Sequence, residues 1–347
     1  MIKVGIIGAT GYVGTELVRL LRSHKEVEIK YITSQSYIGQ KYDSIYENFR
    51  DVFQIECSEQ DLEKIAEEVD VMFIALPHGI ASKEITASIL EKCKVIDLGA
   101  DYRLKNQDVY EEWYNTNHLS PELLEEAVYG LCEINREEIK KARLIANPGC
   151  YPTSSTLSLA PLLKEDLIEK DSIIIDAKSG VTGAGRSLNL GTHYTECNES
   201  IKAYGVASHR HTPEIEEQLS YLGEEEVYIN FTPHLVPMNR GILTTSYAKL
   251  KEKLSYKDVK SIYEKYYKDE YFVRLTKEGI LPETKWVKGS NFCDIGLKVD
   301  ERTGRVIVIG AIDNMIKGAA GQAVQNMNIL FNLDEKTGLD DVSIFPG

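Results

Sequence analysis

One cysteine lies in a sequence context that favours nucleophilic chemistry. The segment Asn147-Pro148-Gly149-Cys150-Tyr151-Pro152-Thr153 follows a short apolar run and precedes a helical pattern. We therefore expect Cys150 on a turn beside a helix N-terminus, where the helix dipole and backbone N–H groups lower a thiol pKa and stabilise an oxyanion. A thiolate there is suited to acyl transfer. The remaining cysteines lack this context and are expected to act as small apolar residues: Cys57, Cys93, Cys132, Cys197 and Cys293.

A second motif, His209-Arg210-His211-Thr212-Pro213-Glu214, places two histidines at the expected start of another helix. Thr212 is expected to cap that helix, with Pro213 at its first helical position. No third clustered ligand accompanies the two histidines, so the motif favours acid–base work over a zinc site.

A glycine-rich turn, Gly8-Ala9-Thr10-Gly11-Tyr12-Val13-Gly14, directly follows the first apolar run and opens a helical pattern. This is where the pyrophosphate of a dinucleotide meets backbone N–H groups in a Rossmann fold. Gly8 and Gly11 would allow the tight turn, and Gly14 would allow close packing of helix and strand. The other interpretation is that these are only turn glycines.

The end of the second expected strand indicates which dinucleotide binds. NAD enzymes of this fold place an acidic residue there for the ribose hydroxyls, whereas this chain has Ser34, Gln35 and Ser36, with Lys41 nearby. Hydroxyl, amide and ammonium groups suit a 2′-phosphate, so the sequence predicts NADP. A polar turn without a ligand is the alternative interpretation.

The elements that position these groups follow two patterns. Up to residue 148, β-rich runs (3–7, 28–33, 71–76, 94–98 and 143–146) alternate with helical patterns (12–22, 60–68 and 81–92), which predicts a Rossmann doubly wound parallel sheet. After residue 150, a helix over 154–163 precedes strands that predict an α+β domain with a mixed, largely antiparallel sheet: 172–177, 227–231, 242–250, 294–299 and 306–311.

The last helical pattern, over 319–331, is amphipathic and is expected to pack back on the first domain. The expected division is therefore an NADP-binding Rossmann domain of residues 1–148 and 318–347, and a catalytic and oligomerisation domain of residues 149–317. A chain of 347 residues is long enough for two such domains.

The composition indicates which binding partners and which cell compartment to expect. A net charge of −14 disfavours nucleic acid and anionic membranes as partners. The longest strongly apolar run, 71–76, is far too short to span a bilayer, and the N-terminus lacks a signal-peptide pattern. Six scattered cysteines without a CxxC pair indicate reduced thiols and no metal site, so we expect a cytoplasmic protein.

Taken together, these motifs resemble the N-acetyl-gamma-glutamyl-phosphate reductase family of the semialdehyde dehydrogenase superfamily. The resemblance runs nearly end to end, and residues 147–153 and 209–214 are its most specific parts. The other segments that carry it are the glycine turn, Leu76-Pro77-His78-Gly79, the run 97–104 and the run 179–186.

The resemblance implies NADPH-dependent reduction of N-acetyl-L-glutamyl 5-phosphate to the 5-semialdehyde and phosphate, in arginine biosynthesis. Cys150 would form the thioester, and His209 would be the acid–base, with His211 as the alternative. Arg103 would bind phosphate, with Ser179, Arg186, His211 and Glu214 as further substrate ligands. Pro77 and Gly318 would lie at the cofactor.

Three alternatives remain open from the sequence. An aspartate-semialdehyde dehydrogenase or a reductase of carrier-bound aminoadipyl phosphate would use the same chemistry in a different pocket. A noncatalytic NADP-sensing protein would keep the fold, but we expect such a protein to have lost the nucleophile. The expected partners are the small acyl phosphate, inorganic phosphate and further copies of the chain, as a homodimer or homotetramer.

Overall fold

The computed structural model describes residues 1–346 and divides the chain into two compact units. Unit 1 comprises Met1–Pro148 and Ala319–Asp340, and unit 2 comprises Gly149–Gly318 together with the C-terminal residues from Asp341. The division expected from the sequence placed the whole C-terminus with the Rossmann domain. The difference has a local cause, because the backbone N–H of Ile344 donates to the carbonyl of Lys288 (3.2 Å) and the rings of Phe345 and Trp286 pack 4.9 Å apart.

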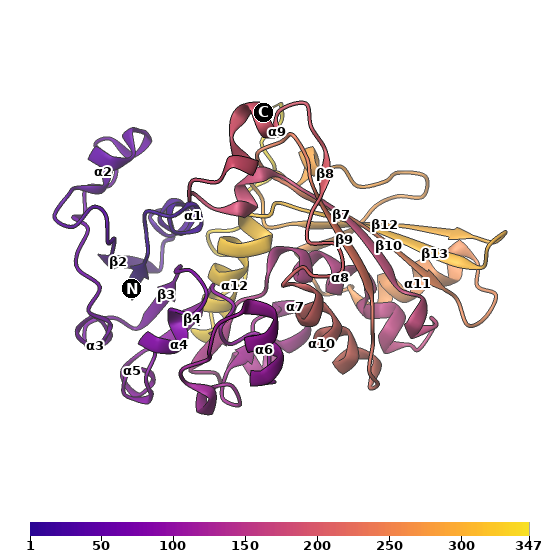
Figure 1. Ribbon diagram of the computed structural model, residues 1–347, viewed down its shortest axis with the longest axis horizontal. Helices are drawn as coiled ribbons and strands as arrows, with labels where there is room; N and C mark the ends of the chain where they lie inside the picture. The colour runs from indigo at the N-terminus through magenta and orange to yellow at the C-terminus, as the bar shows by residue number, and fades with distance from the viewer. Residues whose placement is uncertain (347) are drawn as a thin grey trace. The chain divides into compact units, whose positions relative to one another are not determined.

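Unit 1 is built on a six-stranded sheet with the order β2-β1-β3-β4-β6-β5 (Figure 1). Every pairing is parallel, which confirms the predicted Rossmann sheet. The strands are β1 (Ile2–Ile7), β2 (Val27–Ile32), β3 (Val71–Ile74), β4 (Lys94–Asp97), β5 (Val128–Tyr129) and β6 (Leu144–Ala146).

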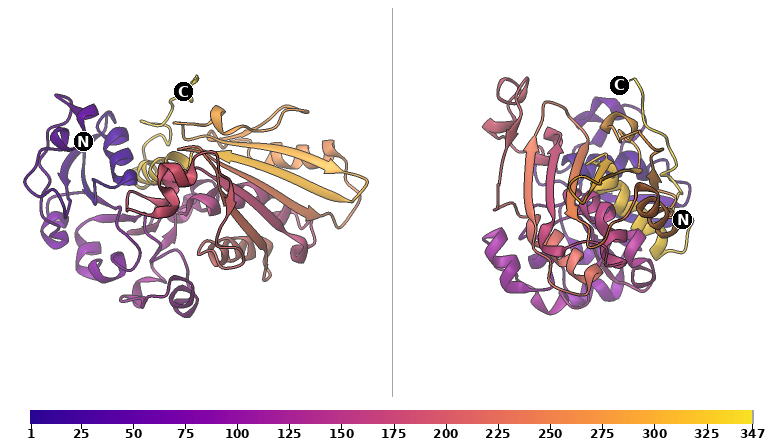
Figure 2. Two further views of the ribbon diagram at one scale, coloured as in Figure 1. Left: turned by 45° about the horizontal axis from the view of Figure 1, so that its top comes forward. Right: turned by 90° about the vertical axis from the view of Figure 1, so that its right-hand side faces the viewer.

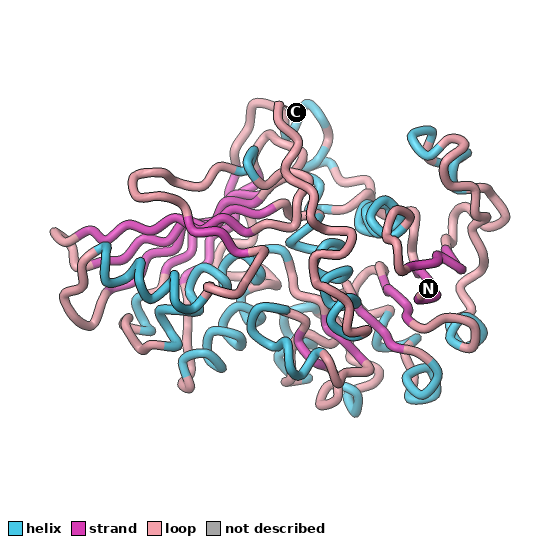
Figure 3. Tube along the Cα trace, turned by 180° about the vertical axis from the view of Figure 1, so that it is seen from behind, coloured by secondary structure: helices cyan, strands magenta, loops and turns pink. Residues whose placement is uncertain are grey.

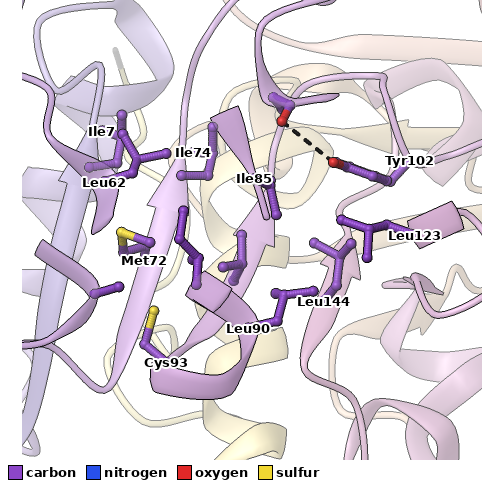
Figure 4. Packing of buried hydrophobic residues seen from close by; sticks show 14 of the residues in the cluster. Ile7, Leu62, Met72, Ile74, Ile85, Leu90, Cys93, Tyr102, Leu123 and Leu144 are labelled. Atoms are coloured by element: carbon purple, nitrogen blue, oxygen red, sulfur yellow. Dashed lines mark hydrogen bonds between the residues drawn. The ribbon is translucent and has the colours of Figure 1, made fainter. Parts of the chain in front are cut away.

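Helices cover this sheet and close its core. They are α1 (Tyr12–Leu21), α2 (Tyr42–Ile45), α3 (Leu62–Ala66), α4 (Ala81–Glu84), α5 (Ala87–Lys92), α6 (Gln107–Tyr114), α7 (Cys132–Ile139) and α12 (Gly321–Leu330). A buried cluster joins Met72 and Ile74 of β3 to Leu62 of α3 and Leu90 of α5 (Figure 4). Helix α12 packs against α1 and α7, as its amphipathic pattern predicts.

The single helix expected over 81–92 is wrong, because the structure holds two short helices there. Ile85 and Thr86 between them adopt extended backbone, and the Thr86 side chain accepts a hydrogen bond from the N–H of Ile89 (3.2 Å). Two adjacent β-branched residues disfavour a helix, and a threonine side chain competes as an N-cap.

Unit 2 holds a seven-stranded sheet with the order β11-β12-β13-β10-β7-β9-β8. Only β11/β12 and β7/β9 pair in parallel among the described strands, so the sheet is mixed and largely antiparallel, as predicted. The strands are β7 (Ile174–Ser179), β8 (Lys202–Ala203), β9 (Asn230–Leu235), β10 (Ile242–Lys249), β11 (Val273–Leu275), β12 (Cys293–Asp300) and β13 (Arg305–Ile312).

The helices of unit 2 gather on one face of this sheet (Figures 2 and 3). Helix α8 (Cys150–Lys164) packs on β10, β12 and β13, and α10 (Thr212–Gly223) and α11 (Tyr256–Tyr266) pack on α8. A short helix, α9 (Tyr194–Cys197), lies in the loop between β7 and β8. Within residues 1–346, no helix has the length and apolar character needed to cross a membrane.

Candidate active site

The glycine turn of unit 1 has the shape that a pyrophosphate site requires. Gly8 has φ +82°, and a Cβ there would lie 2.5 Å from the carbonyl oxygen of Ala75. A Cβ on Gly14 would lie 2.4 Å from the carbonyl oxygen of Gly8. Gly11 is the N-cap of α1 and no side chain caps this helix end. The turn is therefore restricted to glycine at both ends and presents a helix N-terminus, so these residues fit a dinucleotide phosphate.

The loop after β2 lies against this turn. The hydroxyls of Ser34 and Thr10 are 2.8 Å apart, and Ser34 is buried whereas Gln35 and Ser36 are exposed. The structure thus brings the loop predicted to bind the 2′-phosphate next to the turn predicted to bind the pyrophosphate.

The loop after β3 carries Pro77, which is exposed, and is anchored by a buried carboxylate. Asp101 accepts hydrogen bonds from the N–H of Gly79 (2.7 Å), from the N–H of Ser82 (2.9 Å) and from the hydroxyl of Tyr110 (2.7 Å). Three hydrogen-bond donors thus satisfy this buried carboxylate.

Asp97, at the end of β4, is buried beside Asp101. Burial, and secondarily the charge of Asp101, raises the pKa of Asp97 to about 8. One of its oxygens accepts from the N–H of Gly99 (2.9 Å), and the other has no hydrogen-bond partner among the described residues. Asp97 is therefore mostly protonated at pH 7.

Arg103 lies among backbone carbonyls. It is almost fully buried, and its guanidinium donates from Nε to the carbonyl of Asn147 (2.8 Å) and from Nη2 to that of Leu98 (2.8 Å). The side-chain amide of Asn147 in turn donates to the carbonyl of Ala319 (3.1 Å). Arg103 thus holds the segment that leads into Cys150.

Cys150 is the first residue of α8, with Gly149 as the N-cap and without a side-chain cap. The helix begins earlier than the predicted residue 154, because Pro152 is tolerated in a first helical turn. The carboxylate of Glu214 accepts a hydrogen bond from the N–H of Gly149 (2.8 Å). A Cβ on Gly318 would lie 2.8 Å from that of Cys150, so only glycine fits behind the cysteine.

His209 is held as one tautomer. Its Nδ1 accepts a hydrogen bond from the backbone N–H of His211 (3.0 Å), so the neutral ring carries its proton on Nε2. Burial, and secondarily the charge of Arg210, lowers the pKa of His209 to about 4. The ring packs edge-on against Tyr151 and Tyr204 at 5.5 and 5.4 Å.

Helix α10 begins at Thr212, with His211 rather than Thr212 as the N-cap, so the predicted cap is wrong by one residue. The ring of His211 contacts that of His209, with centroids 4.9 Å apart. Both histidines therefore lie in one cluster at the start of α10.

Two tyrosines that sequence reasoning missed lie in the same cluster. The hydroxyls of Tyr151 and Tyr204 are 3.0 Å apart, and Tyr151 also hydrogen-bonds the Ser179 side chain. Burial mainly raises the pKa of Tyr204 to about 12, and the charge of Cys150 contributes. Tyr151 could have been suspected because it follows Cys150, whereas no sequence signal places Tyr204 nearby.

The remaining predicted ligands differ in their setting. Ser179 is buried at the end of β7, and its hydroxyl donates to the carbonyl of Gly180 (3.0 Å). Arg186 lies on an exposed loop after this strand. Glu214 is fully buried, facing the start of α8. Throughout the described part of the chain, no three His, Cys, Asp or Glu residues gather in a way that could hold a metal ion.

A parallel Rossmann sheet, a mixed sheet and a cysteine at the start of its first helix define the semialdehyde dehydrogenase class. Residues 3–142 match the family model described as semialdehyde dehydrogenase, NAD binding domain. Residues 150–314 match semialdehyde dehydrogenase, dimerisation domain. The solved structure of aspartate semialdehyde dehydrogenase II from Vibrio cholerae, complexed with ASA, has a TM-score of 0.73 at 17% identity, covering 96% of this chain and 98% of that one.

Full-length sequence relatives define the family more closely. N-acetyl-gamma-glutamyl-phosphate reductase from Lachnoclostridium phytofermentans is 60% identical, with 100% of both chains covered. The enzymes of that name from Lachnospira eligens and Campylobacter jejuni are each 56% identical, covering 100% and 97% of this chain and 100% and 98% of theirs. The chain belongs to the N-acetyl-gamma-glutamyl-phosphate reductase family. An aspartate semialdehyde dehydrogenase with NADP from Candida albicans shares the fold, with a TM-score of 0.71 at 18% identity over 95% of this chain and 99% of that one.

Proposed function

We propose that this enzyme reduces N-acetyl-L-glutamyl 5-phosphate to N-acetyl-L-glutamate 5-semialdehyde and phosphate with NADPH, as a step of arginine biosynthesis. The observation that carries this proposal is 60% identity over the full length to a reductase of that name. The thiol of Cys150 at the uncapped start of α8 supports it independently.

Cys150 is the nucleophile. Its sulfur forms a bond to the acyl carbon, the bond from that carbon to the phosphate oxygen breaks, and inorganic phosphate leaves a thioester on Cys150. The N-terminus of α8 stabilises both the thiolate and the oxyanion that develops beside it. Gly318 leaves room for the cysteine side chain.

NADPH, when bound, supplies a hydride to the thioester carbon. The neutral imidazole of His209 donates a hydrogen bond from Nε2–H to the carbonyl oxygen and stabilises the negative charge that develops there. The negative oxygen then re-forms the carbonyl, the carbon–sulfur bond breaks, the semialdehyde leaves and Cys150 returns as thiolate. The hydrogen bond at Nδ1 keeps the Nε2–H tautomer that the donor role requires.

Four residues are proposed to bind the substrate. His211, Ser179 and Arg186 are proposed substrate ligands, and Arg103 is proposed as a phosphate ligand that also holds the segment before Cys150. For Glu214, its complete burial and its bond to Gly149 support a positioning role at the nucleophile.

Unit 1 is the proposed NADP-binding domain. The pyrophosphate would lie on the turn formed by Gly8, Thr10, Gly11, Tyr12, Val13 and Gly14, and the 2′-phosphate on Ser34, Gln35 and Ser36. Pro77 would flank the cofactor, whereas the contact of Gly318 with Cys150 supports a place for Gly318 at the nucleophile. Unit 2 contains a dimerisation-type domain, and we expect a homodimer or homotetramer in the cytoplasm.

A substrate panel in the reverse direction tests this function. With NADP and inorganic phosphate, N-acetylglutamate semialdehyde should be oxidised at least a hundredfold more efficiently than aspartate semialdehyde, measured as kcat/KM from the NADPH absorbance. Equal efficiency, or a preference for aspartate semialdehyde, would contradict the proposed substrate. Binding of NADP without turnover of any semialdehyde would favour the noncatalytic alternative.

A further inference from the structure

The carbonyl groups of the glycine turn are held by two tyrosines of the neighbouring segment. The hydroxyl of Tyr42 donates to the carbonyl of Ala9 (2.9 Å), and the hydroxyl of Tyr46 donates to the carbonyl of Thr10 (2.7 Å). Tyr42 also donates to the hydroxyl of Thr15 in α1 (3.2 Å). Two consecutive peptide groups of the turn are thus fixed by side chains outside it.

These bonds determine where the turn's N–H groups face. A trans peptide places its C=O and N–H on opposite sides. With the carbonyl of Ala9 bound by Tyr42, the N–H of Thr10 faces away from Tyr42. The carbonyl of Thr10 and the N–H of Gly11 are related in the same way, and this N–H also closes the turn onto Gly8 (3.2 Å).

The same segment carries the residues proposed to read the 2′-phosphate. It begins at Ser34, whose hydroxyl lies 2.8 Å from that of Thr10, and continues through Gln35 and Ser36 to Tyr42. Three side-chain contacts therefore join this loop to the pyrophosphate turn, one near its beginning and two at α2.

Aromatic packing makes Tyr42 a rigid support. Its ring is fully buried and meets Phe49 and Phe53 edge-on, at 5.2 and 5.5 Å between centroids. Tyr46 packs on Tyr42 at 5.3 Å and is half-buried. The position of the two hydroxyls is thus fixed by the packing of residues 42–53.

We propose that Tyr42 and Tyr46 are positioning residues for cofactor specificity, which hold the pyrophosphate turn and the 2′-phosphate loop at a fixed separation. The inference rests on the proposed NADP site of unit 1. NADP spans both parts of this site, whereas NAD lacks the group that the loop would bind. Loss of the hydroxyls therefore weakens NADP more than NAD.

Dissociation constants of NADP and NAD for Tyr42→Phe, Tyr46→Phe and the double variant test the proposal. Each single variant should weaken NADP binding about three- to tenfold, the range expected for one lost hydrogen bond. The ratio of NAD to NADP dissociation constants should fall by a similar factor. Tyr46 is only half-buried, so Tyr46→Phe should disturb folding less than Tyr42→Phe. If Tyr42→Phe does not fold, Tyr46→Phe still tests the proposal.

Tyr102→Phe is the matched control. Tyr102 is also buried in unit 1, but its hydroxyl pairs with that of Ser120 (2.8 Å) and donates to the carbonyl of Ala81 (3.4 Å, the dashed line in Figure 4), and neither residue belongs to the turn. The control should lose stability without any change in the cofactor ratio. An unchanged ratio of NAD to NADP dissociation constants in the double variant, or an equal change of this ratio in Tyr102→Phe, would overturn this inference. The proposed NADP site would not be affected by either result. A wild-type protein without NADP preference would overturn the proposed cofactor together with it.

Discussion

At the scale of single residues, the structure assigns distinct tasks to side chains that the sequence could only group. Cys150 and Glu214 lie far apart in the chain, yet the carboxylate of Glu214 accepts a hydrogen bond from Gly149, the residue before Cys150. The two histidines of one motif also differ in their roles. The backbone N–H of His211 donates to Nδ1 of His209 and so fixes the tautomer of His209.

Cys150→Ser should abolish turnover and leave NADP binding unchanged, since a serine hydroxyl at this position is a far weaker nucleophile than a thiolate. Mass spectrometry of the wild type mixed with acyl phosphate, without NADPH, should find the acyl group on the peptide containing Cys150. Cys197→Ser, which changes a half-buried cysteine elsewhere in unit 2, should keep full activity. An acyl group on Cys197 would remove Cys150 from the mechanism.

His209→Asn should lower kcat by ~10²–10³-fold, the usual contribution of one positioned hydrogen-bond donor to a developing oxyanion. His211→Asn should act mainly on KM, because a ligand that only binds the substrate contributes equally to ground and transition states. Steady-state kinetics of both variants separate the two roles. A collapse of kcat confined to His211→Asn would reverse them.

The pH profile follows from the direction of the His209 shift. A pKa of about 4 keeps the imidazole neutral down to roughly pH 5, so protonation of His209 should not limit kcat between pH 5 and 8. The measurement is kcat against pH for the wild type, with His209→Asn for comparison. An acidic fall in wild-type kcat centred near pH 6.5, absent from the variant, would show an unshifted histidine and contradict the burial argument.

At the scale of elements, strong periodicity made the parallel strands and α12 predictable. Weak or competing signals explain the errors of the sequence analysis. Strands β5 and β8 were missed, because each has only two residues, too few to show a periodic pattern. The prediction of one helix over 81–92 was wrong at Ile85 and Thr86. There Thr86 caps a second helix, although the apolar periodicity continues through both residues. The sequence indicates candidate site residues where they form a contiguous motif, as at Cys150, whereas Tyr204 comes near Cys150 only through tertiary packing.

The loops after β3 and β4 share the Asp97–Asp101 pair, which makes the stability of unit 1 depend on pH. Asp97 has a pKa of about 8 in the folded state and an ordinary value near 3.8 when unfolded. Its contribution to stability is therefore complete below pH 4 and is lost as the pH rises towards and through 8.

Asp97→Asn replaces the neutral acid by a neutral amide of similar shape. The free energy of unfolding of this variant should fall less steeply between pH 5 and 9 than that of the wild type. Denaturant unfolding at several pH values measures both slopes. Parallel slopes would show that Asp97 is ionised in the folded protein.

At the scale of the whole molecule, the relative affinity for NADP and NAD tests the proposed cofactor site of unit 1. NADP should bind at least tenfold more tightly than NAD, a difference of ~1.4 kcal/mol, because no acidic side chain follows β2 between Thr33 and Lys41. Titration of both dinucleotides decides this. Equal affinities would contradict the assignment of Ser34, Gln35 and Ser36.

The chain returns to unit 1 at residues 319–340, and this return has a consequence for synthesis on the ribosome. Helix α12 is buried, and its Gln322 and Asn326 side chains donate to the carbonyl of Gly130 at 2.9 and 2.8 Å. A nascent chain holding only residues 1–148 contains every strand of the parallel sheet but lacks these donors and the helix that packs against α1 and α7 until α12 emerges. The main stretch of unit 2, residues 149–318, leaves the ribosome before α12 does. Unit 1, which is begun first, is therefore completed only after the main stretch of unit 2 has been made.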